Sequence, residues 1–227
     1  MASSRQTWLP ARDGGKRPPG RPRSEDSRRA ILRSTLKLLR RQSLAELSIE
    51  AIAADAKVGK ATVYRWWPNK GALVVDAFVS STDEELRFPD SGSVYRDMAL
   101  QISQFVAVLH SSRGCIVKAV IAAGQSDPKL LEEFRNRLLR PRRQWAYRTL
   151  RRGIERGELP GNLDLDLVLD VLYGAVYMRF LIRHSEMDEN YASEVCRMVL
   201  EGAAAQAREK LKPAIRHNGW KRRAARN

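Results

Sequence analysis

The sequence predicts an all-α protein with a small N-terminal three-helix unit and a larger C-terminal helical bundle. Most segments repeat apolar residues at intervals of three and four, the spacing that places them on one face of a helix. No stretch alternates apolar and polar residues as a half-buried strand would, and the chain has no internal repeat. A group of helix-breaking residues, Phe88–Gly92, separates the two parts.

Most of the positive charge lies at the two ends of the chain. The 227 residues carry a formal net charge of +15, which favours a polyanionic partner. Residues 1–23 hold six Lys or Arg against one acidic residue, and residues 208–227 hold eight against one. We expect two disordered basic tails around a nearly balanced folded body, so net charge alone is weak evidence for a nucleic-acid partner.

The first helix is expected at residues 24–42. Ser24 stands at its N-cap position, and the acidic pair Glu25 and Asp26 suits the positive end of the helix dipole. Apolar residues then recur along one face, which predicts that this face is buried.

Residues 48–67 are expected to form two short helices joined by a tight turn. Apolar residues within Ile49–Ala56 share one face of the first helix, and Ser48 stands at its N-cap position. A turn that includes Gly59 follows, and the second helix is expected at Lys60–Trp67. This arrangement is typical of a helix-turn-helix, whose second helix enters the major groove of DNA.

The outward side chains of the second helix suit contact with DNA. Lys60 supplies a cation, Thr62 offers a hydroxyl and a methyl group to a base edge, and the phenol of Tyr64 can reach a phosphate. Ala61 is small enough to let the helix come close, and Lys70, which begins the next helix, can neutralise a phosphate.

This region resembles the DNA-binding region of the TetR family of bacterial repressors. The resemblance rests on L-S-I-E-A-I-A-A-D-A-K-V-G followed by K-A-T-V-Y-R-W-W-P-N-K-G-A-L, and it covers residues 25–85. It implies that Lys60 and Thr62 face bases. It also implies that Tyr64 and Lys70 meet the DNA backbone, and we expect Ser48 on a phosphate as well.

Two positions depart from the family pattern. Lys57 stands where many members have Gly, and Gly59 stands where many have Ser. If position 57 requires a positive φ angle, lysine costs about 1 kcal/mol there. Without a serine at position 59, we expect the second helix to lack a side-chain cap, although neither change removes a DNA-facing group.

The segment before the first helix, Gly20-Arg21-Pro22-Arg23, is extended and cationic. Arg21 and Arg23 are candidates for a narrow A·T-rich minor groove, where the negative potential is enhanced. The alternative is a solvated basic tail with no fixed contact.

Residues 90–207 are expected to form a helical effector-binding and dimerisation domain. A helix at 70–86 leads into this domain and links it mechanically to the DNA-binding unit. Further helices are expected at 94–110, 114–124, 128–156, 165–184 and 190–206. An interior proline, Pro141, should kink the helix at 128–156 or split it in two.

The helices at 165–184 and 190–206 predict a homodimer. The first is apolar nearly all round and therefore needs cover on all sides. The second contains Gly202 and Ala203, which allow close approach of another helix. Family members dimerise through their last two long helices, and a two-fold dimer reads two DNA half-sites. An ordinary monomeric core is the alternative.

The resemblance also implies a small-molecule effector bound within the bundle. Helical bundles can enclose an apolar cavity with a few polar groups. The candidate lining residues are aromatic: Phe105, Trp145, Tyr173, Tyr177 and Phe180. Aromatic residues at helical spacing also form ordinary cores, and that reading stays open.

The sequence offers little for catalysis. The three histidines are far apart, and none has a Cys, Asp or Glu at metal-ligand spacing. No phosphate-cradling loop or nucleophile motif is present. We therefore expect no enzymatic activity, no metal and no cofactor.

The two unpaired cysteines are typical of a reducing compartment, and no long apolar run is free of charges. We therefore expect a cytoplasmic, nucleoid-associated bacterial protein without a membrane segment.

These observations predict a ligand-responsive repressor that binds a palindromic double-stranded DNA operator as a homodimer. By the mechanism that the resemblance implies, an effector shifts the helix at 70–86. This shift changes the spacing of the two recognition helices, which are the Lys60–Trp67 helices of the two subunits. The alternative is an architectural, sequence-tolerant DNA-binding protein that works through its basic tails.

Overall fold

Helices make up every regular element in the computed structural model, which describes residues 24–188 and 190–208. The N-terminal helices are α1 (Glu25–Leu39), α2 (Ile49–Asp55), α3 (Lys60–Tyr64) and α4 (Lys70–Thr82). The others are α5 (Val94–His110), α6 (Gly114–Gly124), α7 (Pro128–Phe134), the π-helical turn η1 (Arg135–Leu139), α8 (Arg140–Glu155), α9 (Leu165–Ile182) and α10 (Tyr191–Arg208). The all-α prediction is confirmed. The predicted arm at 1–23, with Arg21 and Arg23, and the predicted tail beyond Arg208 lie outside the described residues.

Side-chain caps fix where three of the N-terminal helices begin. The Ser24 hydroxyl accepts a hydrogen bond from the Ser27 N–H, and the Ser48 hydroxyl accepts one from the Ala51 N–H at 3.1 Å. Asn69 caps α4 in the same way. Each cap satisfies a backbone donor that has no partner within its helix. The starts of these helices therefore lie where the sequence placed them.

Several helices end earlier than the sequence predicted. The first ends at Leu39 rather than at residue 42, α3 ends at Tyr64 rather than at Trp67, and α4 ends at Thr82 rather than at residue 86. After α3 the Trp66 N–H already bonds to the carbonyl three residues back, which tightens the turn, and the residue before a proline avoids helical geometry.

The last two helices also differ from their predicted ends. Helix α9 stops at Ile182 because Arg183 adopts a left-handed conformation with φ 58°, two residues before the predicted end at 184. Helix α10 continues to Arg208, two residues past the predicted end at 206.

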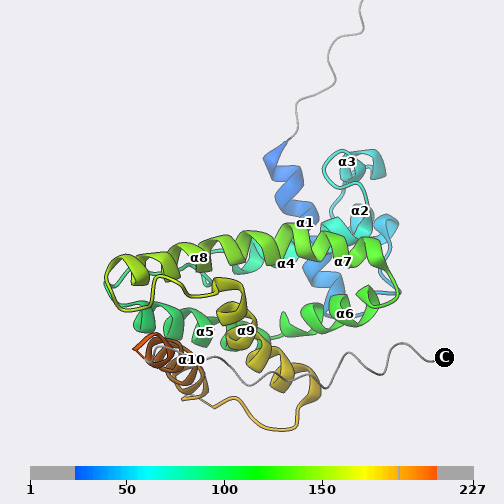
Figure 1. Ribbon diagram of the computed structural model, residues 1–227. Coiled ribbons are helices and arrows are strands. Elements are labelled where there is room, and N and C mark those ends of the chain that lie inside the picture. Colours follow the sequence, from blue (N-terminus) through cyan, green and yellow to red (C-terminus); the bar gives the residue numbers. More distant parts are fainter. Residues whose placement is uncertain (1–23, 189, 209–227) are drawn as a thin grey trace, which may run out of the picture.

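The long helix predicted at 128–156 is split by the turn η1. The Arg140 N–H bonds to the carbonyl of Arg135, five residues back, which is the π pattern. Pro141 follows at once, and it cannot donate to the carbonyl four residues before it. The prediction that Pro141 splits this helix is right, but the split is a wide turn, and α7 and α8 run on in nearly one line in Figure 1.

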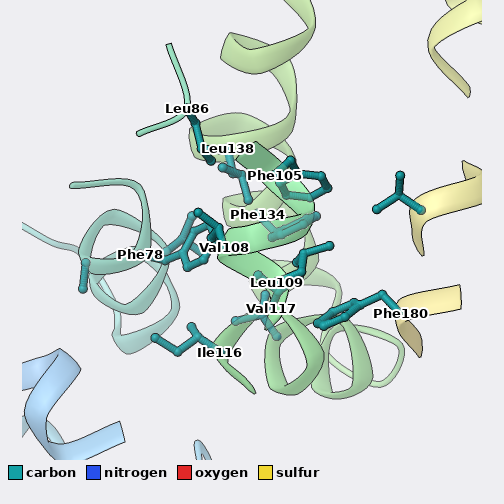
Figure 2. Packing of buried hydrophobic residues seen from close by; sticks show 14 of the residues in the cluster. Phe78, Leu86, Phe105, Val108, Leu109, Ile116, Val117, Phe134, Leu138 and Phe180 are labelled. Atoms are coloured by element: carbon teal, nitrogen blue, oxygen red, sulfur yellow. The ribbon is translucent and has the colours of Figure 1, made fainter. Parts of the chain in front are cut away.

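Helix α4 lies at the centre of the molecule. It packs against α1 on one side and against α6, α7 and η1 on the other, whereas α5 packs against α8, α9 and α10 (Figure 1). One continuous apolar cluster joins these layers. Within it, Phe78 of α4, Ile116 of α6 and Leu138 of η1 surround one small apolar gap, and Figure 2 labels all three. A shift of α6 or η1 therefore acts directly on α4.

In the part of the chain that the structure describes, no single helix is long and apolar enough to cross a membrane. The pair α5 and α6 meets the length and composition criteria only when taken together, and these two helices are bent by 84°.

Candidate DNA-binding site and its links to the C-terminal helices

Helix α3 rests on α2 through its buried side and turns its other side to solvent. Val63 of α3 and Ile52 of α2 are both completely buried, which fixes the rotation of α3 about its own axis. Tyr64 is 52% exposed, and Lys60 and Ala61 are exposed beside it. Thr62 is half-buried at the edge of this surface. The structure therefore brings the four predicted α3 residues onto one accessible part of the molecule.

The turn before α3 has the geometry that the family pattern requires. Lys57 has φ 55°, in the left-handed region, and its N–H closes the end of α2 on the carbonyl of Ala54. Gly59 precedes α3 without a side-chain hydrogen bond. Both consequences expected from the two departures are therefore present: a lysine in a strained conformation and a helix without a side-chain cap.

Lys60, the predicted base-facing cation, already has a partner. Its Nζ lies 2.6 Å from the Glu50 carboxylate of α2, and both side chains are more than half exposed. The hydrogen bond from Lys60 lowers the pKa of Glu50, and the hydrogen bond to Glu50 raises the pKa of Lys60. An exposed pair of this kind contributes little to stability, so DNA can displace Glu50 at small cost.

Lys70 binds the loop that precedes α2. Its Nζ donates to the carbonyl of Leu44 at 2.9 Å and to that of Leu47 at 2.8 Å. The carbonyl of Ala45 lies at 3.5 Å as a third acceptor, so all three donors of the ammonium group point to this loop. Lys70 therefore positions the segment that carries Ser48, a role that the sequence reasoning missed.

A polar network joins the segment after α3 to the C-terminal helices. The indole N–H of Trp67, a fully buried residue, donates to the Asp76 carboxylate of α4 at 2.8 Å. The other carboxylate oxygen of Asp76 accepts from Arg137 of η1 at 3.2 Å. Arg137 also donates to Glu133 at 2.6 Å, and Glu133 accepts from the amide of Asn69, the cap of α4, at 2.9 Å.

This network holds the segment after α3 at two points, Trp67 and Asn69. Burial alone would raise the pKa of Glu133, but hydrogen bonds from Arg137 and Asn69 lower it below the ordinary value. Glu133 therefore stays charged near neutral pH, and together with Asp76 it holds Arg137 in place. Sequence reasoning missed this network, although Asp76 gave a signal as the one acidic residue within the apolar run of α4.

A second link joins the other end of α4 to the loop before α6. The Arg113 guanidinium donates to both carboxylate oxygens of Glu85 at 2.7 Å and to the carbonyl of Ser81 at 2.7 Å. Two parallel bonds to one carboxylate fix direction as well as distance. Both ends of α4 are therefore tied to the C-terminal helices by arginines.

The five aromatic residues predicted to bind a ligand do not form one cluster. The rings of Tyr173 and Tyr177 lie 5.9 and 5.6 Å from the ring of Phe105, edge to face, and the Tyr173 hydroxyl donates to Gln101 at 2.5 Å. Burial raises the pKa of both tyrosines. Trp145 instead lines a groove beside α4, and Phe180 lines a separate opening near the end of α9.

The acidic residues at the start of α9 serve the fold. Asp164 caps the helix by accepting from the Leu167 N–H, while Asp166 and Asp170 both pair with Arg143 of α8. Across the described residues, no group of three His, Cys, Asp or Glu side chains is placed to hold a metal ion.

Comparison with known proteins agrees with this geometry. Residues 31–77 match the family model described as bacterial regulatory proteins, tetR family, and residues 88–199 match the tetracyclin repressor-like C-terminal domain. An uncharacterised helix-turn-helix transcriptional regulator of Bacillus subtilis, YdeS, is 38% identical over 186 residues, which are 82% of this chain and 94% of that one. The DNA-binding transcriptional repressor TetR of Mycobacteroides abscessus is 28% identical over 66% of this chain and 79% of its own.

A solved structure extends the agreement to three dimensions. The crystal structure of the TetR family transcription regulator SCO0332 superposes with a TM-score of 0.70 at 32% identity, covering 78% of this chain and 98% of that one. The molecule is a helix-turn-helix DNA-binding transcriptional regulator. Within that class, the chain belongs to the TetR family.

The strained turn before α3 gives a prediction about stability. Replacing Lys57 with glycine should raise the free energy of unfolding by about 0.5–1 kcal/mol, because glycine adopts positive φ without steric cost. Urea denaturation measures this change. The matched control is Ala54→Gly in α2, where the backbone is helical and glycine should lower stability by about 1 kcal/mol. Equal losses for both variants would show that position 57 is not strained.

Proposed function

We propose that this regulator is a ligand-responsive repressor that binds a palindromic operator as a homodimer. The observation that carries the proposal is that buried contacts and hydrogen bonds hold α3 and the segment after it in place. The outer surface of α3 is free for DNA, while the Trp67–Asp76–Arg137 chain of hydrogen bonds ties the following segment to the C-terminal helices. A change in those helices therefore has a direct route to the DNA-binding surface.

On DNA, each predicted residue has a distinct task. Lys60 exchanges Glu50 for a base edge or phosphate, and Thr62 presents its hydroxyl and methyl group to a base pair. Tyr64 and Ser48 meet phosphates on either side of the groove, and Ala61 lets the helix approach. Lys70 adds positive charge near the backbone while it holds the loop of Ser48.

The surfaces of α9 and α10 support a homodimer through these helices. Leu167, Met178 and Ile182 of α9 are each more than half exposed, and Met198 of α10 is 78% exposed. Large apolar side chains exposed on two helices that pack together mark an interaction surface. A second copy of the same surface would cover them and would place two recognition helices on two half-sites.

The effector is expected among the C-terminal helices, where both arginine links to α4 begin. A ligand shifts an equilibrium only by its difference in affinity for the two states. A coupling free energy of about 1–3 kcal/mol would weaken operator binding roughly 5–150-fold.

Family membership does not favour the architectural alternative, in which the basic tails dominate binding. Residues 25–85 and 90–207 then act as the DNA-binding and the effector-binding parts, in a cytoplasmic protein located on the bacterial nucleoid.

The proposal is tested by selecting genomic fragments that the full chain binds at about 150 mM salt. The expected result is one shared palindrome, because a two-fold dimer reads two equivalent half-sites. Fragments without a common motif, combined with an affinity that collapses as salt rises, would favour the tails as the main binding element and overturn the repressor proposal.

Substitutions on α3 should separate backbone contacts from base contacts. Tyr64→Ala should weaken binding to all sequences by a similar factor, whereas Thr62→Ala should reduce discrimination at one or two base pairs by about 1 kcal/mol each. Competition binding with single-base operator variants measures both effects. Leu100→Ala on α5 is the control, because it shortens a half-exposed side chain far from α3 along the chain. Equal losses on operator and random DNA for Thr62→Ala would contradict the base contact.

A charge placed on the exposed apolar face should break the dimer. Met198→Lys is expected to raise the dimer dissociation constant at least about tenfold, because the ammonium group would be buried without a partner. Sedimentation velocity measures the change. Ala122→Lys introduces the same charge on an exposed position of α6 and should leave the dimer intact. A Met198→Lys protein that dimerises as tightly as the Ala122→Lys control would place the interface elsewhere.

A further inference from the structure

A groove of about 330 Å³ lies between the end of α4 and the η1–α8 segment. Its floor is apolar, formed by the buried side chains of Leu86 and Leu138, which point toward each other from two segments in Figure 2. Phe88 and Trp145 form its walls, and Trp145 is 54% exposed. The volume lies at the small end of the range for ligand sites, and a large exposed tryptophan beside an apolar floor is typical of such sites.

The charged residues around this groove are mostly positive. Three arginines, Arg87, Arg137 and Arg142, and one acid, Asp83, line it. Arg137 is already held by the carboxylates of Asp76 and Glu133. The other two arginines therefore determine what the groove attracts.

Arg142 is the unusual group. Its Nη1 donates to the backbone carbonyl of Leu86, and within the described ranges no carboxylate lies within ion-pair distance of it. Burial lowers the pKa of Arg142 below its ordinary value, although Asp83 partly opposes this effect. A partly buried guanidinium with only a neutral partner is costly, and an anion from outside would remove that cost. Arg87 is exposed at the same rim and adds a second positive charge.

We propose that this groove is the effector site and that it binds a small aromatic carboxylate. The carboxylate group would lie between Arg142 and Arg87, and the flat ring would stack on Trp145 above Leu86 and Leu138. A planar guanidinium matches the two oxygens of a carboxylate. The Arg148 guanidinium lies 4.6 Å from the centroid of the Trp145 ring, and the ligand ring would cover the part of this half-exposed indole that Arg148 leaves open. This inference rests on the proposed function and names its ligand class.

The position of Arg137 connects the site to DNA binding. Arg137 lines the groove, and the same guanidinium holds Asp76, the acceptor of the Trp67 indole. A ligand held by Arg142 and Arg87 fills the groove beside Arg137 and displaces its side chain. A shift of Arg137 weakens its hold on Asp76 and Glu133, which loosens the segment after α3 and the cap of α4 together and lowers the affinity for DNA.

A larger opening of about 760 Å³ near the end of α9 fits an effector less well. It lies next to Leu181 and Ile182, which belong to the exposed apolar part of α9. The shape of this opening would change on dimerisation, and no hydrogen bond in the described residues joins its cations to the network of Asp76.

The test uses 2-naphthoate and its neutral analogue 2-naphthalenemethanol, titrated into the DNA-free full chain by calorimetry. The carboxylate should bind at least about tenfold more tightly than the alcohol. Arg142→Gln should abolish this preference, and Arg142→Lys should retain part of it. Arg135→Gln, an exposed arginine in η1 that does not line the groove, is the matched control and should behave as the parent. Thermal unfolding confirms that each variant is folded, and Trp145→Ala, at an exposed position, provides a second variant that should weaken both ligands.

Three results would overturn the proposal: equal affinity for the two compounds, an unchanged preference in Arg142→Gln, or unchanged DNA affinity when 2-naphthoate is saturating. Because ligand binding is measured without DNA, its failure leaves the operator proposal intact. Conversely, failure to recover a shared palindrome from the genome would leave the calorimetric result standing.

Discussion

The Asp76 carboxylate is the interaction on which the rest of the arrangement depends. It lies within the central helix α4, and its two oxygens point to opposite halves of the molecule, one to the Trp67 indole and one to the Arg137 guanidinium. Partial burial of a carboxylate costs desolvation free energy, and hydrogen bonds to both of its oxygens offset that cost. The segment after α3 and the C-terminal helices are therefore both bonded to the Asp76 carboxylate, and neither can move far without affecting the other.

The turn η1 explains how Arg137 comes to lie there. An unbroken α-helix through 128–156 would clash at Pro141, and the wide turn absorbs the misfit. The turn includes Arg137. Its hydrogen bond spans five residues instead of four, so the side chains after the turn point in different directions from those they would have in an unbroken α-helix. A backbone irregularity caused by one proline thus coincides with the residue that joins the two halves, in keeping with the frequent presence of π turns at functional sites.

Patterns within a few residues predicted the helices of this molecule better than they predicted contacts between distant segments. Apolar spacing and the capping residues Ser24 and Ser48 located the first two helices, because those interactions span only three or four residues. The positive φ of Lys57 was likewise predictable from the family pattern. The exact helix ends, the carbonyl partners of Lys70 and the separation of Trp145 from Phe105 depend on how distant segments pack, and no short window of sequence contains that information.

The Glu50–Lys60 pair has a consequence for how the protein searches DNA. Because Lys60 already holds a carboxylate, its move to DNA exchanges Glu50 for a phosphate or a base acceptor. On random DNA that exchange only replaces one exposed ion pair by another, so it gains little free energy. Only where the bases beneath Lys60 offer good acceptors does the exchange become favourable. Glu50 would thus weaken non-specific adsorption more than operator binding, and it would keep a chain with a net charge of +15 mobile along the chromosome.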